Sequence, residues 1–291
     1  MADSLLDRLH AAIADSRSAV LATAISGADV GAKVLVEVGA RPDSASGDAE
    51  TLRQTAGWTD AGLEERVVRD AESALVSGVT SVRRYGDGGR LDGDAHQVFY
   101  ETHVPPPRLV IFGAVDFSAA LVRVAKVLGH HVTVCDARAT FATTARFPHA
   151  DEVVVDWPHR HLAEIGARLG PRDAVCVLTH DPKFDVPAVI AALDTDVGYI
   201  GALGSRTTTD DRAERLRAGG VSDEDLSRMM APIGLDLGAR SPEETAVAIC
   251  AEIIAVQTGR IVPSLRDTAG PIHPRPAVAD GPRPAASEGG R

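Results

Sequence analysis

Hydrophobic and polar positions follow one pattern before residues 105–107 and another after them. Downstream of these three prolines, short apolar runs alternate with amphipathic stretches of helical period. The apolar runs lie at residues 109–112, 132–135, 153–155, 174–178 and 197–200. Such alternation is typical of a parallel sheet covered by helices on both faces. The sequence therefore predicts a doubly wound α/β domain over residues 105–262.

The first 104 residues instead mix strand-like and helical periods. Helical spacing of apolar residues predicts helices over residues 4–16 and 60–75, the second stopped by Gly78. Strand-like runs occupy residues 19–25, 33–38, 80–85 and 97–102. We expect a smaller α+β domain over residues 1–104, separated from the second domain by the stiff proline spacer.

Two serines mark helix starts near the carboxyl end. Ser222 and Ser241 are each followed by an acidic residue three positions later, the pattern of a capping box, and Gly259 follows the last helical stretch. Residues 263–291 are rich in proline, glycine, alanine and serine without periodicity, so they are predicted to be a disordered tail.

Composition narrows the classes of partner. The 291 residues are 44% hydrophobic and carry a formal net charge of −11, without a dense basic stripe, which argues against nucleic acid or anionic lipid as a partner. No apolar run reaches the ~18 residues of a membrane span and no leader pattern is visible, so a cytoplasmic location is expected. Cys135, Cys176 and Cys250 lack metal-ligand spacing and are interpreted as buried structural thiols.

The turn after the first strand of the second domain resembles a dinucleotide-binding layout. Gly113, Ala114 and Asp116 lie between that strand and the following helix, and Asp136 ends the next strand with Arg138 close behind. In such folds the turn presents amides to phosphate and the acid takes ribose hydroxyls. A tight turn and a solvated strand end are the simpler readings of these residues.

Two positions in this turn depart from the usual glycine pattern. Val115 and Ser118 stand where a GxGxxG fingerprint has its second and third glycines. A Cβ at position 115 lies where backbone would approach pyrophosphate, so ordinary binding of NAD is not expected.

Later strand ends carry further polar residues. Thr179, His180 and Asp181 end the fourth strand of the second domain. Ligands of open α/β sheets bind at the carboxyl ends of strands, so these three residues are candidate ligand contacts, with His180 either structural or a hydrogen-bonding group.

The fifth strand of this domain leads through glycines into a helix. Gly201, Gly204, Ser205 and Arg206 form a candidate anion site, because free amides, the helix dipole and a guanidinium all favour phosphate there. The alternative is a glycine turn with Ser205 as the helix cap.

Several segments in order resemble one family. They are residues 109–114 (LVIFGA), 134–138 (VCDAR), 179–181 (THD), 199–206 (YIGALGSR), 232–238 (PIGLDLG), 241–244 (SPEE) and 251–253 (AEI). Together they resemble the Rossmann domain of the XdhC/CoxI proteins.

The resemblance implies an accessory or maturation factor rather than an enzyme. Such a protein binds molybdenum cofactor, a pterin that carries a phosphate and a dithiolene-held metal, and assists its insertion into a xanthine-dehydrogenase-like or CO-dehydrogenase-like molybdenum hydroxylase apoenzyme. A cysteine desulfurase is an implied further partner. No catalytic or metal-binding residue is assigned. Exposed sheet edges in the smaller domain separately predict a homodimer.

The chain departs from the family pattern at two places. Val115 and Asp116 replace a glycine and a histidine, which puts the identity of the ligand in question. In the first domain residues 61–64 (AGLE) are nearest to a Gly-Gly-Cys-x-Glu-like element, and Leu63 stands in place of the thiol, so position 63 offers no sulfur ligand to molybdenum.

Two rival functions stay open. An NAD(P)-dependent oxidoreductase would need a positioned acid or base, such as a tyrosine and lysine pair in a helix, and the few lysines offer none. A non-catalytic nucleotide-binding sensor would suit the altered turn at Val115.

Overall fold

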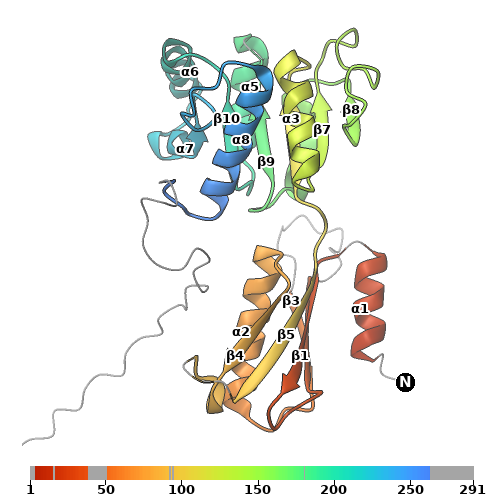
Figure 1. Ribbon diagram of the computed structural model, residues 1–291. Helices are drawn as coiled ribbons and strands as arrows, with labels where there is room; N and C mark the ends of the chain where they lie inside the picture. Colours follow the sequence, from red (N-terminus) through yellow and green to blue (C-terminus); the bar gives the residue numbers. More distant parts are fainter. Residues whose placement is uncertain are drawn as a thin grey trace, which may run out of the picture.

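The chain forms two separate β-sheets, each covered by helices (Figure 1). The computed structural model describes residues 4–15, 17–38, 51–91, 93, 95–179 and 181–262. All strands of the first sheet precede residue 104, and the second sheet begins at Arg108. Residues 105–107 therefore connect the two sheets. Within the described residues, no helix is long and apolar enough to cross a membrane.

The first sheet is antiparallel, with the order β3-β2-β1-β5-β4. Its strands are β1 (Ala19–Ser26), β2 (Lys33–Val38), β3 (Thr51–Ala56), β4 (Ser81–Tyr85) and β5 (His96–His103). Four of the five match the predicted runs closely. The edge strand β3 was not predicted, because its residues are mostly exposed and lack a buried apolar stripe.

Helix α2 (Ala61–Ser77) covers one face of this sheet. Asp60 caps it by accepting hydrogen bonds from the amides of Gly62 and Leu63, and Gly78 ends it in the left-handed conformation at φ 70°. Leu63 is fully buried in the apolar cluster between α2 and the sheet. The helix start and stop thus agree with the signals in the sequence.

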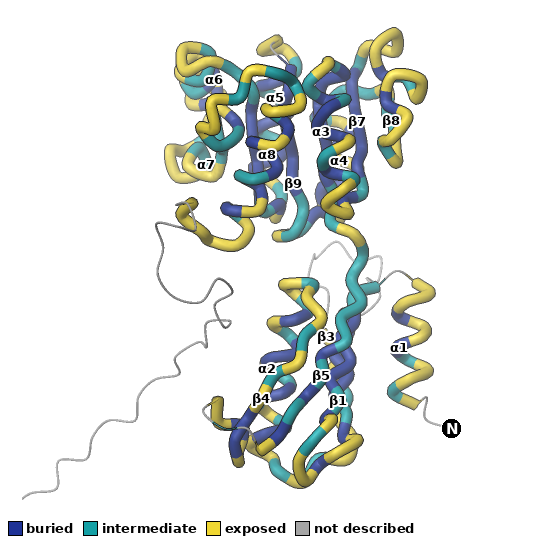
Figure 2. The backbone as a smooth tube through the Cα atoms, in the orientation of Figure 1, coloured by how far each residue is buried: buried dark blue, intermediate teal, exposed yellow. Residues whose placement is uncertain are grey.

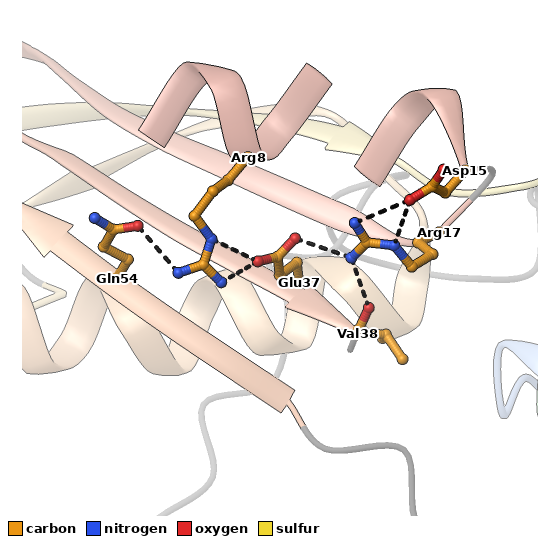
Figure 3. Close-up of polar contacts among 6 residues, drawn as sticks. All are labelled: Arg8, Asp15, Arg17, Glu37, Val38 and Gln54. Atoms are coloured by element: carbon orange, nitrogen blue, oxygen red, sulfur yellow. Dashed lines mark hydrogen bonds and ion pairs between the residues drawn. The ribbon is translucent and has the colours of Figure 1, made fainter. Parts of the chain in front are cut away.

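Helix α1 (Leu5–Ala14) covers part of the opposite face, where a buried carboxylate accepts hydrogen bonds from two arginines. Glu37 of β2 accepts from Arg8 of α1 and, at 3.0 Å, from Nη1 of Arg17 (Figure 3). The Glu37 side chain is 4% exposed, whereas both arginines retain contact with solvent. These ion pairs join the helix to the sheet around the small apolar cluster of Leu9 and Leu35.

The second sheet is entirely parallel, with the order β11-β10-β9-β6-β7-β8. Its strands are β6 (Arg108–Phe112), β7 (His131–Cys135), β8 (Glu152–Val154), β9 (Ala174–Val177), β10 (Tyr199–Ala202) and β11 (Met229–Met230).

Helices cover both faces of this sheet, and its strands are largely buried (Figures 1 and 2). On one face α3 (Asp116–Val127) and α8 (Pro242–Gln257) pack together, with Leu121 and Ile249 in one cluster. The other face carries α4 (Pro158–Ile165), α5 (Pro182–Leu193) and α6 (Arg206–Ala218). The prediction of a doubly wound parallel sheet with a smaller α+β part before it is confirmed.

Local signals near the carboxyl end are partly confirmed. Ser241 forms a reciprocal capping box with Glu244 at the start of α8. Ser222 also caps its helix, α7 (Asp223–Ser227), but the side chain of Asp225 accepts from the serine hydroxyl. All three cysteines are buried and free, as predicted. The predicted tail, residues 263–291, lies outside the described residues.

We predict that Glu37→Ala lowers the free energy of unfolding by about 1–3 kcal/mol, because it leaves two guanidinium groups without their buried acceptor. Urea unfolding of the full chain measures the change. Glu65→Ala is the matched control, since Glu65 is 71% exposed and pairs with the exposed Arg69 on α2. It should change stability by about 0.5 kcal/mol or less. Equal effects of the two substitutions would contradict the assignment.

Candidate functional site

The strand order of the parallel sheet reverses between β6 and β9. From β6 the chain proceeds outward through β7 and β8, and it then returns to build β9, β10 and β11 on the other side. In open α/β sheets the loops diverge at such a point and leave a crevice at the carboxyl ends of the strands. The turns after β6, β7, β9 and β10 contain the residues singled out from the sequence.

Gly113 and Thr179 meet at this end of the sheet. Gly113 has φ +110°, and a Cβ on it would lie 2.8 Å from Cγ2 of Thr179 and 3.1 Å from the Thr179 amide nitrogen. Glycine is therefore required at position 113 for both backbone conformation and space. Thr179 is 8% exposed, and its Oγ1 has no hydrogen-bond partner among the described residues.

Asp136 is occupied by neighbouring donors. Its Oδ2 accepts from the Ala114 amide at 2.8 Å and from Nη2 of Arg138 at 2.7 Å, and its Oδ1 accepts from the amide and Nε of Arg138. The carboxylate is nearly fully buried, and the Arg138 guanidinium lies 4.5 Å from the centre of the Phe141 ring. Asp136 thus fixes the turn after β6 and orients Arg138, which is about half exposed.

These contacts set the protonation of Asp136. Burial alone would raise its pKa, but hydrogen bonds from the Arg138 side chain and from the Ala114 and Arg138 amides outweigh burial, so the pKa is lowered. The group is a carboxylate at neutral pH.

Helix α3 begins without a side-chain cap. Val115 is its N-cap residue, and although its carbonyl accepts from the Ser118 amide, its side chain provides no cap, so the amides of Asp116 and Phe117 remain for another acceptor. Asp116 is exposed and lies 3.5 Å from Arg146. Ser118 is fully buried, and its hydroxyl donates to the Gly113 carbonyl. A serine therefore fits at the packing position where the fingerprint has glycine.

The starts of α5 and α6 are both capped. Asp181 accepts from the Lys183 amide at 3.0 Å, and Ser205 accepts from the Thr208 amide at 3.1 Å. Arg206 is exposed at the first position of α6. His180 lies outside the described residues.

Gly201 and Gly204 serve different purposes. A Cβ at Gly201 would lie 2.4 Å from Cδ1 of Ile233 and 2.7 Å from the Tyr199 hydroxyl, so this glycine permits packing inside the fold. A Cβ at Gly204 would lie 3.1 Å from Thr208 and 3.7 Å from Nη1 of Arg212. Of the two, Gly204 is the one on the loop that leads into α6.

Arg212 was not identified from the sequence. It is 2% exposed, and its Nη2 donates to Oδ2 of Asp185 at 3.0 Å and to the Leu203 carbonyl at 2.8 Å. The available signal is its position four residues before Leu216, which places it on the face of α6 that packs against the sheet. An arginine at such a position is buried only when it is paired.

A small aromatic surface borders the start of α5. The rings of Trp157 and Phe184 lie 4.9 Å apart, and Nζ of Lys183 is 5.0 Å from the centre of the Trp157 ring. Both rings are partly exposed. Such a surface suits stacking with a flat heterocycle.

The thiols do not provide a soft-metal site. Burial raises the pKa of Cys135 to about 12 and that of Cys250 to about 11, and it also raises the pKa of Cys176. All three are therefore protonated at neutral pH. No group of three or more histidine, cysteine, aspartate or glutamate side chains that could hold a metal ion occurs in the described part of the chain.

We predict that Asp136→Asn lowers the free energy of unfolding by about 1–3 kcal/mol at pH 7. The folded-state pKa lies below the unfolded value of about 3.9, so the carboxylate stabilises the fold above that pH and loses its effect as the pH falls through the folded-state value. The difference between wild type and variant, measured by urea unfolding, should shrink in acid. Asp210→Asn, at an exposed position on α6, should change stability by about 0.5 kcal/mol or less at either pH. A difference for Asp136→Asn that does not vary with pH would contradict the assignment.

Comparisons with known proteins agree with the Rossmann fold of the second sheet. Residues 109–253 match the model of the XdhC Rossmann domain. The chain is 35% identical over 157 residues to a probable xanthine dehydrogenase subunit of Bacillus subtilis (strain 168), covering 54% of this chain and 45% of that protein. It is 33% identical over 95 residues to the molybdenum cofactor insertion chaperone PaoD of Escherichia coli (strain K12), covering 33% of this chain and 30% of that protein.

A solved structure of a protein described as a xanthine dehydrogenase from Bacillus halodurans has a TM-score of 0.49 and 21% identity, covering 89% of this chain and 97% of that one. The matched regions span less than half the length of the two curated relatives. The resemblance seen in the sequence motifs is confirmed by the match over residues 109–253. Residues 109–253 therefore belong to the XdhC Rossmann domain family.

Proposed function

We propose that this protein is an accessory factor that binds molybdenum cofactor and assists its insertion into a molybdenum hydroxylase apoenzyme. One observation carries the proposal: the buried Thr179 hydroxyl, just after β9, lacks a partner among the described residues at the same end of the sheet as the uncapped start of α3. A buried hydroxyl without a partner is unfavourable unless a ligand or a water molecule forms a hydrogen bond with it. The relatives named for xanthine dehydrogenase and cofactor insertion support the choice of cargo.

The residues at the sheet edge fit the pterin and phosphate part of this cargo. Amides at the starts of α3 and α6, together with the exposed Arg138 and Arg206, are the donors that a phosphate prefers. The described residues supply no thiolate for the metal. We infer that the protein binds the pterin and phosphate of the cofactor and leaves the molybdenum end accessible to the apoenzyme.

The same geometry disfavours a dinucleotide in its usual position. Both oxygens of Asp136 are already hydrogen-bonded, so this acid is not available to ribose hydroxyls. Val115 keeps its Cβ in the turn where pyrophosphate would approach. The two alternatives, a nucleotide sensor and an NAD(P)-dependent oxidoreductase, are therefore tested by the binding experiment below.

We expect purified protein to bind molybdenum cofactor, released from a donor enzyme under anaerobic conditions, in a saturable manner. Thr179→Val should weaken binding about tenfold, or ~1.4 kcal/mol, because it removes the hydroxyl and keeps the shape. The substitution replaces an unpartnered buried hydroxyl by a methyl group, so it should not destabilise the fold.

Thr55→Val, on the exposed edge strand β3, is the control and should bind as the wild type does. Binding of NADP or another nucleotide by the wild type, without binding of molybdenum cofactor, would show that the family fold serves a different ligand here.

The remaining partners are proposed on the family resemblance. The client is a xanthine-dehydrogenase-like or CO-dehydrogenase-like apoenzyme, and a cysteine desulfurase supplies sulfur to the metal before insertion. This exchange is proposed to take place in the cytoplasm.

We also predict a homodimer. Strands β3 and β4 form the two edges of the antiparallel sheet among the described residues, and pairing of such edges between two copies satisfies their backbone groups. Light scattering coupled to gel filtration should give about twice the chain mass of 30.4 kDa. A mass that stays at that of one chain across the accessible concentration range would refute the dimer.

A further inference from the structure

We propose that Arg212 is the inner guanidinium of an oxyanion site between α5 and α6, and that this site takes a phosphate monoester. The proposal deepens the proposed function, since the pterin of the cargo carries a phosphate. It concerns the phosphate group alone, so it can be tested without the cofactor.

A pocket of about 220 Å³ lies between the two helices. Helix α5 contributes Asp185, and helix α6 contributes Thr208, Arg212 and Arg215. The pocket adjoins the loop that contains Gly204, because Arg212 bonds to the carbonyl of Leu203 in that loop. It therefore lies next to the loop that the sequence predicted to bind an anion.

Arg212 is held in place but not fully used. Its Nη2 is bonded to Asp185 and to the Leu203 carbonyl, which fixes the plane of the guanidinium. Its Nη1 is buried and has no partner among the described residues. Burying the N–H groups of a charged side chain without an acceptor is costly, so a further acceptor is expected at Nη1.

Gly204 lies close to this nitrogen, and the space beside it is narrow. A Cβ at position 204 would lie 3.7 Å from Nη1 of Arg212 and 3.1 Å from Cβ and Cγ2 of Thr208. The backbone of Gly204 is not in the left-handed region, so conformation does not require glycine there. We infer that glycine keeps open the side from which an oxyanion reaches Arg212.

Other donors surround the same space. The hydroxyls of Ser205 and Thr208 lie 3.0 Å apart at the first turn of α6, whose first amides have no partner within the helix. A phosphate accepts from amides, hydroxyls and a guanidinium together.

The carboxylates of the pocket limit what it can bind. Asp185 is paired with Arg212, and the exposed Asp211 and Arg215 also line the pocket, so its formal charges balance. Selection must then come from directed hydrogen bonds rather than from net charge. This arrangement favours a tetrahedral oxyanion whose oxygens match the directions of the donors. It does not favour a polyanion, which would be attracted by net positive charge.

Calorimetric titration of the full chain with inorganic phosphate and with phenyl phosphate tests the proposal. We expect saturable binding of both, weakened at least tenfold by Arg212→Gln and at least fivefold by Gly204→Ala. The second variant keeps every charge and only narrows the approach, so it remains informative even if Arg212→Gln unfolds. Arg206→Ala should weaken binding less than threefold, because that side chain is exposed and water competes with phosphate for its guanidinium group.

Arg217→Gln is the matched control, since Arg217 is an exposed arginine of the same helix that pairs with Asp223 outside the pocket. It should bind phosphate as the wild type does. Absence of phosphate binding by the wild type, or wild-type affinity in Gly204→Ala, would overturn the proposal. Phosphate binding without cofactor binding would support the Arg212 site and refute the proposed function. Cofactor binding without phosphate binding would refute the Arg212 site and support the proposed function.

Discussion

Close contact between the ends of β6 and β9 is the constraint on which the candidate site depends. Gly113 leaves the sheet in a conformation that few other residues adopt, and its missing side chain lets it lie against Thr179. A Cβ at position 113 would crowd Thr179, which directly follows the strand that pairs with β6 through Leu109–Phe112 and Ala174–Val177. The turns at this end of the sheet are thus positioned by the packing of β6 against β9.

Two pairs of carboxylate and guanidinium, each with a buried carboxylate, then stabilise the loops on either side. Asp136 and Arg138 fix the turn after β6, whereas Asp185 and Arg212 tie α5 to α6 and to the loop before it. The pairs differ in one respect that matters for binding. Both oxygens of Asp136 are engaged by neighbouring donors, whereas Arg212 retains a nitrogen without an acceptor among the described residues. A buried charge of the first kind supports structure, and one of the second kind has capacity for a ligand.

The sequence predicted the parallel sheet well because each buried strand is a continuous apolar run and because helices α3 and α4 are clearly amphipathic. Strand β3 escaped detection because an exposed edge strand needs no such run. The turn residues Gly113 and Thr179 were found through their place at strand ends, but their mutual contact depends on register between segments far apart in the chain. Arg212 was missed because α6 also contains the exposed Arg215 and Arg217, and only the tertiary structure distinguishes the buried arginine from its neighbours.

The distribution of sulfur has a consequence for how the two sheets can be observed. All three thiols lie in or against the parallel sheet, and the sequence has no cysteine before residue 135. Leu63, in place of a cysteine, is buried in the apolar cluster between α2 and the antiparallel sheet, so this core contains no thiol. Modification of thiols by an alkylating reagent therefore reports opening of the Rossmann domain alone. Opening of the antiparallel sheet exposes no thiol, so comparing thiol modification with a second unfolding probe tests whether the two sheets open together.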